Sequence, residues 1–169
     1  ALDDGIFPWN MKGKEIGGRT YLSFPPVKFD EDRIFREMKE KALSVPSPVI
    51  GLNNIGDIRF AKENPQFSYF ADIYLYLSNR EAAELLREEV PSLEGGYLWV
   101  ERDSYERPWP FTPTAASGYR MPLFISRSCY RHDSLGLSCD ECKRHSLHHI
   151  RQNERRYEVT VDDCLTLVR

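Results

Sequence analysis

Four cysteines are the residues of this 169-residue chain whose types and spacing best suit chemistry. They are Cys129, Cys139, Cys142 and Cys164, in the order C-x9-C-x2-C-x21-C, and all fall in the last quarter of the chain. A C-x-x-C pair can direct two thiolates at one ion from a tight turn, and two more thiolates complete a tetrahedral set. The spacing therefore predicts a metal site.

Two kinds of metal centre suit this ligand set. Zinc and a [4Fe-4S] cluster both take four cysteine ligands. Zinc ribbons place two C-x-x-C pairs together, whereas this chain has one pair and two single cysteines, so we favour the cluster and keep zinc as the alternative. Two disulfides, which need an oxidising compartment, structural thiols and a redox-active C-x-x-C pair are the other interpretations.

Histidines surround the cysteines, at positions His132, His145, His148 and His149. Any of them could replace a cysteine as a ligand. His145 and His149, four residues apart, also suit one face of a short solvated helix. Because four cysteines are available, we interpret the histidines as surface residues or as residues that support the ligands from outside.

The elements that must position these cysteines alternate between strand and helix. Apolar and aromatic runs predict strands over residues 19–29, 47–56, 69–79, 95–103 and 121–126. Helices are predicted over residues 30–45, 57–64 and 80–90. The first of these helices places four apolar residues on one stripe, namely Ile34, Phe35, Met38 and Ala42.

Alternating strands and helices predict an α/β fold of parallel β/α units, which form a partial (half) TIM-like barrel because only four strands precede residue 104. We expect a C-terminal four-cysteine metal-binding segment after it. Residues 1–20 are interpreted as an entry segment or the remnant of a preceding region, and 21–169 as a single β/α domain with the cysteine-rich site in 129–164. Because the chain begins with Ala1, we expect an N-terminal half of the same polypeptide before it.

Charge and hydropathy limit the partners. The 26 acidic and 23 basic residues are interspersed and leave a net charge of −3, which predicts no general attraction to nucleic acid. We interpret one local group of basic residues as solvated charge: Lys143, Arg144, Arg151, Arg155 and Arg156. No apolar run approaches the ~20 residues that span a bilayer, and no signal peptide is visible. We expect a cytoplasmic protein with no membrane partner.

The cysteines also lie in a longer pattern, "PLFISRSCYRH…CDEC…YEVTVDDCLTLV". It resembles the end of the core domain in the collagenase-like peptidase family, number thirty-two among the peptidases of unknown catalytic type. Upstream, "PVIGLNNIGDIRFAKE" and "DIYLYLSNREAAELL" resemble that family's Asn-x-Gly turn and its Asp-x-x-Leu-Asn-x-x-Asn strand. Asn79 matches the second asparagine of that strand, and Tyr76 stands in place of the first. The resemblance covers residues 45–168.

The resemblance implies a β/α-barrel-like fold in which the four cysteines hold an iron–sulfur cluster. It also implies oxygen-independent hydroxylation of RNA bases or ubiquinone precursors, so we expect a modification enzyme acting on RNA or a small aromatic substrate. A protease and a non-catalytic module with structural zinc are the alternatives. The catalytic residues stay unassigned, because no spaced nucleophile, base and orienting group is evident.

Three asparagines are candidate substrate contacts, because β/α folds place their sites at the carboxyl ends of the strands. They are Asn53, Asn54 and Asn79, each near the end of a predicted strand. Their amides suit hydrogen bonds to a base or a carbonyl group. Asparagine at such positions also caps turns and helices, which is the competing interpretation.

Overall fold

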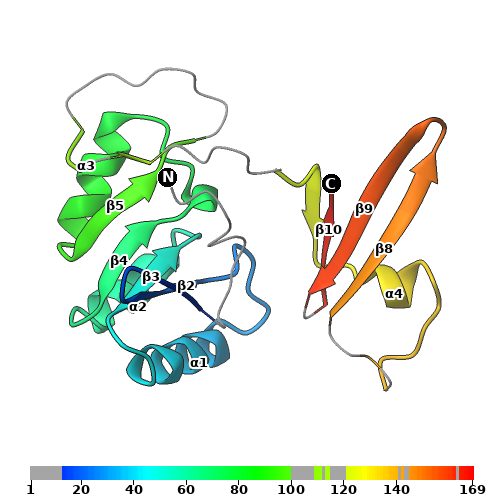
Figure 1. Ribbon diagram of the computed structural model, residues 1–169, viewed down its shortest axis with the longest axis horizontal. Helices are drawn as coiled ribbons and strands as arrows, with labels where there is room; N and C mark the ends of the chain where they lie inside the picture. The colour runs from blue at the N-terminus through cyan, green and yellow to red at the C-terminus, as the bar shows by residue number, and fades with distance from the viewer. Residues whose placement is uncertain are drawn as a thin grey trace. The chain divides into compact units, whose positions relative to one another are not determined.

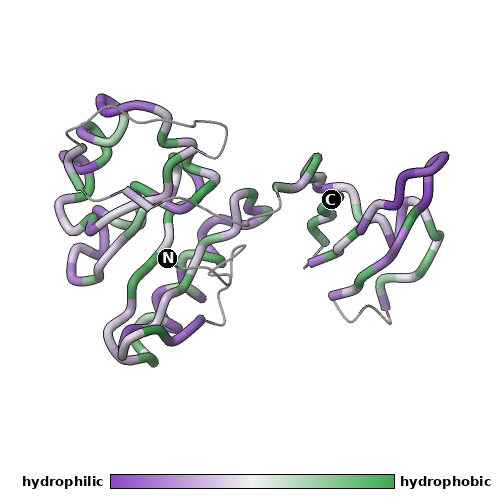
Figure 2. Tube along the Cα trace, turned by 45° about the horizontal axis from the view of Figure 1, so that its top comes forward, coloured by the Kyte–Doolittle hydropathy of each residue, from purple (hydrophilic) through white to green (hydrophobic). Residues whose placement is uncertain are grey.

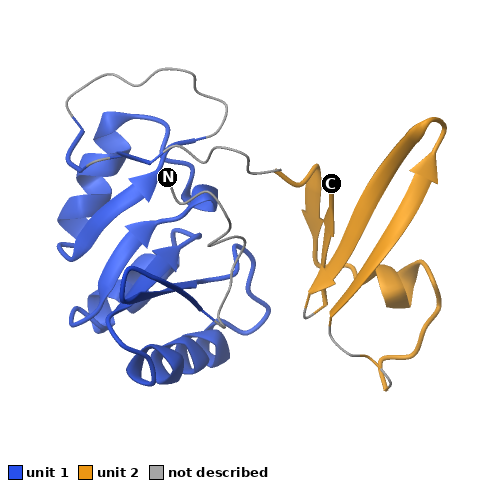
Figure 3. Cartoon of the chain, in the orientation of Figure 1, with its two compact units in different colours: residues 1–118 blue, residues 119–169 orange. Residues whose placement is uncertain are grey.

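The structure, a computed structural model, describes residues 13–99, 109–111, 113–114, 121–140, 142, 145–162 and 164–169. The chain divides into two compact units, residues 1–118 and 119–169 (Figure 3). Each unit has its own β-sheet. Residues 1–12 of the predicted entry segment lie outside the described residues. So do residues 100–103, the last four of the strand predicted over residues 95–103.

The described part of the first unit contains a six-stranded sheet with helices between its strands. In chain order its elements are β1 (Lys14–Ile16), β2 (Arg19–Ser23), α1 (Glu31–Leu43), β3 (Pro48–Leu52), α2 (Asp57–Glu63), β4 (Ser68–Ala71), the 3-10 helix η1 (Ile73–Leu75), α3 (Arg80–Glu89), β5 (Leu93–Tyr97) and β6 (Pro113–Thr114).

The strands of this sheet follow one another in the order β1-β2-β3-β4-β5-β6. β1 is antiparallel to β2, and the two are joined by Gly17 and Gly18, whose φ angles of 58° and 77° suit a tight hairpin turn. Every later pair of neighbours is parallel. The sheet is curled, as Figure 1 shows, and the carboxyl ends of β2 to β5 share one edge.

Helix α1 confirms the helix that the apolar stripe predicts. The Asp30 side chain accepts a hydrogen bond from the Arg33 N–H at 3.0 Å and so caps the first turn. Glu31 and Asp32 in that turn complement the positive end of the helix dipole. The residues of the stripe are all buried: Ile34, Phe35, Met38 and Ala42.

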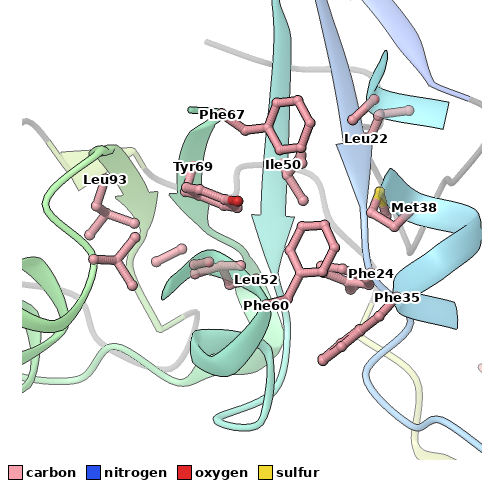
Figure 4. Packing of buried hydrophobic residues seen from close by; sticks show 14 of the residues in the cluster. Leu22, Phe24, Phe35, Met38, Ile50, Leu52, Phe60, Phe67, Tyr69 and Leu93 are labelled. Carbon is pink, nitrogen blue, oxygen red and sulfur yellow. The ribbon is translucent and has the colours of Figure 1, made fainter. Parts of the chain in front are cut away.

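The core of the first unit lies between one face of the sheet and all three helices (Figure 4). Phe24, Phe35 and Phe60 meet there, with ring centroids 5.1 to 5.4 Å apart. The strands contribute alternate residues to the same cluster, including Leu22, Ile50, Leu52, Tyr69 and Leu93. Burying each large apolar side chain stabilises the fold by roughly 1.5–3 kcal/mol.

The apolar run over residues 69–79 is a strand only as far as Ala71, so the predicted continuous strand is wrong beyond that residue. Asp72 accepts a hydrogen bond from the Ile73 N–H at 2.7 Å and starts η1. Tyr76 then adopts a left-handed conformation, with φ 57° and ψ 44°. Apolar composition does not distinguish a buried strand from a buried turn, whereas the local hydrogen bond of an aspartate does.

The second unit is an antiparallel sheet. Its strands lie in the order β7-β10-β9-β8. Its elements are β7 (Phe124–Ser126), α4 (Tyr130–Asp133), β8 (His145–Gln152), β9 (Arg155–Asp162) and β10 (Leu165–Val168). β8 and β9 form a hairpin whose turn begins at Asn153, with φ 55°. Its buried apolar residues come from the last two strands: Val159, Val161, Leu165, Leu167 and Val168.

The predicted fold class is therefore wrong. Parallel β/α units do not continue to the cysteines, because β7 to β10 pair only in antiparallel fashion. The first sheet is mixed as well, since β1 is an antiparallel edge strand. Antiparallel strands need only a short turn between them, so the second unit requires no crossover helix, and α4 has four residues.

Candidate functional site

A group of buried polar side chains lies at the carboxyl ends of β2, β3 and β4. Ser23 is the last residue of β2, Asn53 follows β3, and Asp72 follows β4. Because these strands are parallel neighbours, their carboxyl ends meet at one edge of the sheet. The three residues are 0%, 2% and 1% exposed, respectively, so they contact one another and not solvent.

Asn53 uses both ends of its amide within this group. Its Nδ2 atom donates to the backbone oxygen of Phe24 at 2.7 Å and lies 3.0 Å from both Ser23 Oγ and Asp72 Oδ2. Its Oδ1 atom accepts from the Tyr74 N–H at 3.1 Å. The Ser23 hydroxyl donates to the Asp72 carboxylate. Asn53 therefore joins the ends of three strands.

A second buried carboxylate, that of Asp57, lies at the start of α2. Its Oδ2 atom accepts from the N–H groups of Asn53 and Asn54, at 2.9 Å each, and its Oδ1 atom lies 2.5 Å from Lys28 Nζ. Burial raises the pKa of Asp57, and the Lys28 ammonium acts against that rise. Gly56 takes the N-cap position of α2, and Asp57 is the first helical residue.

The buried carboxyl group of Asp72 has a strongly shifted pKa. Burial raises the pKa from an ordinary value of 3.8 to about 6, although hydrogen bonds from Ser23, from the Ile73 N–H and from Asn53 lower it. Shifted carboxyl groups often mark functional sites. Asp72 is only 1% exposed, however, so protonation of this carboxyl group changes the free energy of unfolding of the unit.

The other two asparagines hydrogen-bond to nearby backbone. Asn54 Oδ1 accepts from the Gly56 N–H at 2.9 Å, and Asn54 Nδ2 donates to the backbone oxygen of Pro26 at 3.1 Å. Asn79 Oδ1 accepts from the Ala82 N–H at 2.8 Å and caps α3. The contacts with Gly56 and Ala82 are the turn and cap contacts that asparagine commonly makes. Asn53 and Asn54 are chain neighbours, and no hydrogen bond within the described residues connects either of them to Asn79.

The sequence does not single out the polar partners of Asn53. Ser23 and Asp72 stand where apolar strands end, and Lys28, which pairs with Asp57, follows two prolines after β2. Polar residues directly after buried strands converge in a parallel sheet, which was the signal available. Their pairing depends on contacts between residues far apart in the chain, which a local pattern does not contain.

Two aromatic rings follow strand ends at the same edge of the first sheet. Tyr76 follows η1 and Trp99 follows β5, and their ring centroids are 4.3 Å apart. The Trp99 N–H donates to the backbone oxygen of Leu77 at 3.1 Å. Tyr76 is 54% exposed and has a positive φ, which is uncommon outside glycine and is often found at functional positions. The pair presents a partly exposed stacking surface.

The four cysteines lie in loops of the second unit. Cys129 directly precedes α4. Cys139 and Cys142 share a turn, in which the Cys142 N–H donates to the Cys139 backbone oxygen at 3.1 Å. Cys164 lies between β9 and β10 with a φ of 68°. None of the four is joined in a disulfide bond.

Strand register brings these loops to one end of the second sheet. β7 ends at Ser126, which is paired with Thr166 near the start of β10. β8 begins at His145, which is paired with Asp162 at the end of β9. The end of β7, the start of β8, the end of β9 and the start of β10 therefore lie at the same end of the sheet. The cysteines all belong to the loops at that end.

Two hydrogen bonds join these loops through α4. The Tyr130 N–H, next to Cys129, donates to Thr166 Oγ1 at 2.9 Å. Arg131 Nη1 lies 3.8 Å from Cys142 Sγ, within hydrogen-bonding range for sulfur. The short helix thus contacts both β10 and the C-x-x-C turn.

The side chains do not converge as the predicted four-cysteine segment requires. Within the described residues, no three Cys, His, Asp or Glu side chains form a group that could hold a metal ion. This part of the predicted fold is wrong, because three separate loops carry the cysteines and only Cys139 and Cys142 share a turn. The loops share one end of the sheet, but the thiols are not gathered around a point.

The histidines around the cysteines lie mainly on a strand. His145 and His149 belong to β8, so the short helix considered for them is not formed. The Nδ1 atom of His145 lies 2.5 Å from the Asp162 carboxylate, its cross-strand neighbour. His148 packs against Tyr130 with ring centroids 5.3 Å apart.

A hydroxyl, a carboxylate and an imidazole meet beside α4. Asp133 accepts a hydrogen bond from the Ser128 hydroxyl, and its other oxygen lies 2.7 Å from His132 Nδ1. In a hydrolytic triad the imidazole stands between the hydroxyl and the carboxylate, so that it can take the hydroxyl proton. Here the carboxylate stands in the middle, and this order does not activate Ser128.

Comparisons with known proteins add no assignment. The chain matches no family model, and searches among curated proteins and solved structures return no match. Across the described residues, no helix is both long enough and apolar enough to span a bilayer.

Proposed function

We propose that the second unit binds a metal centre through the thiolates of Cys129, Cys139, Cys142 and Cys164, a [4Fe-4S] cluster in preference to zinc. One observation carries the proposal: strand register puts the loops of all four cysteines at one end of a small sheet. Four thiolates are the donor set that both centres require. None of the cysteines is used in a disulfide.

The donor chemistry fits a metal centre, and the loops must bring the thiols together on binding. Coupling of this kind is common, because a metal site is rarely preformed without its ion. Cys164 supports the proposal, since its φ of 68° is unfavourable for a residue with a side chain. Such a conformation is expected where the side chain has a role that glycine could not fill.

The proposed enzyme carries out oxygen-independent hydroxylation of RNA or of a small aromatic substrate, as the resemblance to the collagenase-like peptidase family implies. In such a reaction a hydroxylated co-substrate gives up its oxygen and is reduced by two electrons, while a C–H bond of the substrate becomes C–OH. A bound cluster would supply electron transfer. On the substrate side, Tyr76 and Trp99 offer rings against which a base or aromatic group can stack. The buried Ser23, Asn53 and Asp72 join the carboxyl ends of β2, β3 and β4, and Tyr76 follows β4 by way of η1.

Proteolysis has less support. The Ser23 hydroxyl bonds to a carboxylate but is fully buried, and the Ser128 group has its carboxylate and imidazole in the wrong order for a triad. A structural zinc ion remains the alternative for the same four thiolates. Either centre needs reduced cysteines, so we propose a reducing compartment such as the cytoplasm.

Alkylation followed by intact-mass measurement tests the thiolate site. The chain is purified without oxygen and treated with iodoacetamide before and after metal removal. We expect the loaded chain to resist labelling and the stripped chain to gain four groups, because a bound thiolate is a poor nucleophile. Full labelling of all four cysteines in both samples would contradict the proposal.

Single substitutions sharpen this test. Cys129→Ser, Cys139→Ser, Cys142→Ser and Cys164→Ser should each let the remaining thiols react before metal removal. His149→Ala is the matched control, because His149 is exposed on β8 beyond the cysteine loops. It should resist labelling as the unchanged chain does. Analysis of the released metal then distinguishes the two centres. Iron together with sulfide indicates the cluster, and zinc alone indicates the structural site.

A further inference from the structure

The end of the β8–β9 hairpin is strongly basic. Arg151 lies near the end of β8, and Arg155 and Arg156 begin β9, on either side of the turn at Asn153 and Glu154. All three arginines are exposed. We name these residues, 151–156, the arginine tip, and Figure 2 shows this end of the hairpin as hydrophilic.

Two of the arginines face each other across the hairpin. The register pairs Arg151 with Arg156 directly, and like charges in that position repel. The nearest acidic residue along β9, Glu158, lies 4.0 Å from the Arg169 guanidinium. Within the described part of the chain, no ion pair is formed by Arg151, Arg155 or Arg156, so the repulsion is not compensated internally.

The tip also carries polar side chains beside the arginines, among them the neutral Gln152 and Asn153 and the acidic Glu154. Gln152, Asn153, Glu154, Arg155 and Tyr157 line an open hollow of about 580 Å³. Arg151 Nε donates to the backbone oxygen of Asn153 at 3.2 Å, which holds this guanidinium near the turn. Guanidinium groups bind phosphate through paired N–H donors, and side-chain amides can add further contacts.

We propose that the arginine tip binds the phosphate groups of a nucleic-acid strand. Phosphates would neutralise the opposed Arg151 and Arg156 and remove the repulsion that the free hairpin carries. Residues 151–156 contain no apolar side chain that could insert among acyl chains, which favours a strand of phosphates over a lipid surface.

The proposal rests on the hairpin alone and is independent of the thiolate site. Fluorescence anisotropy of labelled single-stranded RNA and DNA of the same mixed sequence measures binding to the whole chain. Each of Arg151→Gln and Arg156→Gln should weaken binding about fivefold at ~0.1 M salt and reduce the slope of log affinity against log salt by about 0.7. The double variant should lose about 25-fold.

Arg87→Gln is the matched control, because Arg87 is an exposed arginine on α3 in the first unit and the charge change is the same. It should bind as the unchanged chain does. Preferential loss of RNA binding or of DNA binding would show which strand the tip prefers, and equal loss of both would show that it binds the phosphates of either; all three outcomes support the proposal. Equal affinities for Arg87→Gln and the double tip variant, or binding to anionic vesicles without binding to either strand, would overturn the proposal.

The metal content of the same variants distinguishes a failure of the arginine-tip proposal from a failure of the thiolate-site proposal. The tip lies at the opposite end of β8 and β9 from the cysteine loops, so Arg151→Gln and Arg156→Gln should keep the metal of the unchanged chain. Loss of nucleic-acid binding with metal retained supports the tip. Loss of metal in Cys142→Ser with nucleic-acid binding retained supports the thiolate site and leaves the tip intact.

Discussion

The Ser23 hydroxyl donates a hydrogen bond to the Asp72 carboxylate and joins the last residue of β2 to the first residue after β4. Neither strand is the immediate neighbour of the other, because β3 lies between them. Asn53, which follows β3, completes the connection. The carboxyl edge of the first sheet is therefore held by polar contacts within a buried environment.

Asn53→Ala should destabilise the first unit by about 2–4 kcal/mol. The substitution removes the hydrogen bonds of Asn53 to Phe24 and Asp72 and leaves buried polar groups without partners. Urea unfolding followed by circular dichroism measures the change. Asn54→Ala is the control, because Asn54 is exposed and should cost less than about 1 kcal/mol. Equal losses for the two variants would show that the buried contacts do not stabilise the edge.

Stability of the first unit should fall as the pH rises from about 4 to about 6. The pKa of Asp72 is raised from 3.8 to about 6, mainly by burial, so the folded chain keeps a proton in this range that the unfolded chain has released. The full shift corresponds to on the order of 3 kcal/mol. Unfolding free energies measured across this range should show the decline in the unchanged chain.

Asp72→Asn isolates the contribution of this carboxyl group. The substituted side chain cannot ionise, so the free energy of unfolding should change less between pH ~4 and ~6 than in the unchanged chain. Asp57, whose pKa is also raised by burial, is present in both proteins. The difference between the two curves therefore reports Asp72, and parallel curves would contradict the assignment.

Cys164→Gly should stabilise the metal-free chain by about 1 kcal/mol, because glycine adopts a φ of 68° without strain. Cys164→Ser keeps a side chain at this position and should stay close to the unchanged chain. Both variants lose one proposed ligand, so both should bind less metal. Thermal unfolding of the metal-free proteins and metal analysis of the loaded ones make the comparison.

Two outcomes would contradict this prediction. If the glycine variant were no more stable than the serine variant, the left-handed conformation of Cys164 would carry no strain. If the glycine variant kept all of its metal, Cys164 would not be a ligand. The thermal stability of the metal-free protein tests the strain, and the metal content of the loaded protein tests the ligand role, so either claim can fail without the other.

Local elements of the fold could be predicted from the sequence. Helix α1 follows from its Asp30 cap and its stripe of apolar residues, and α3 follows from a run of strong helix formers that begins after Asn79. These signals lie within one or two turns of the chain. The structure places both helices where they were expected.

The second unit could not be predicted in the same way. Polar and apolar residues that alternate on either side of Asn153 and Glu154 are typical of a hairpin. The cysteines and histidines next to them favour a metal segment instead. Which strands pair is decided by contacts far apart in the chain, as between Ser126 and Thr166. The types of the proposed ligands are visible in the sequence, whereas their arrangement around one sheet end follows only from the register.

Iron, zinc and acid-labile sulfide content of the whole chain, purified without oxygen, tests the thiolate site most directly. The unchanged chain is expected to carry about four irons and four sulfides, and Cys139→Ser is expected to lose most of both. A chain that carries neither iron nor zinc, with all four thiols open to labelling, would contradict the proposed metal centre.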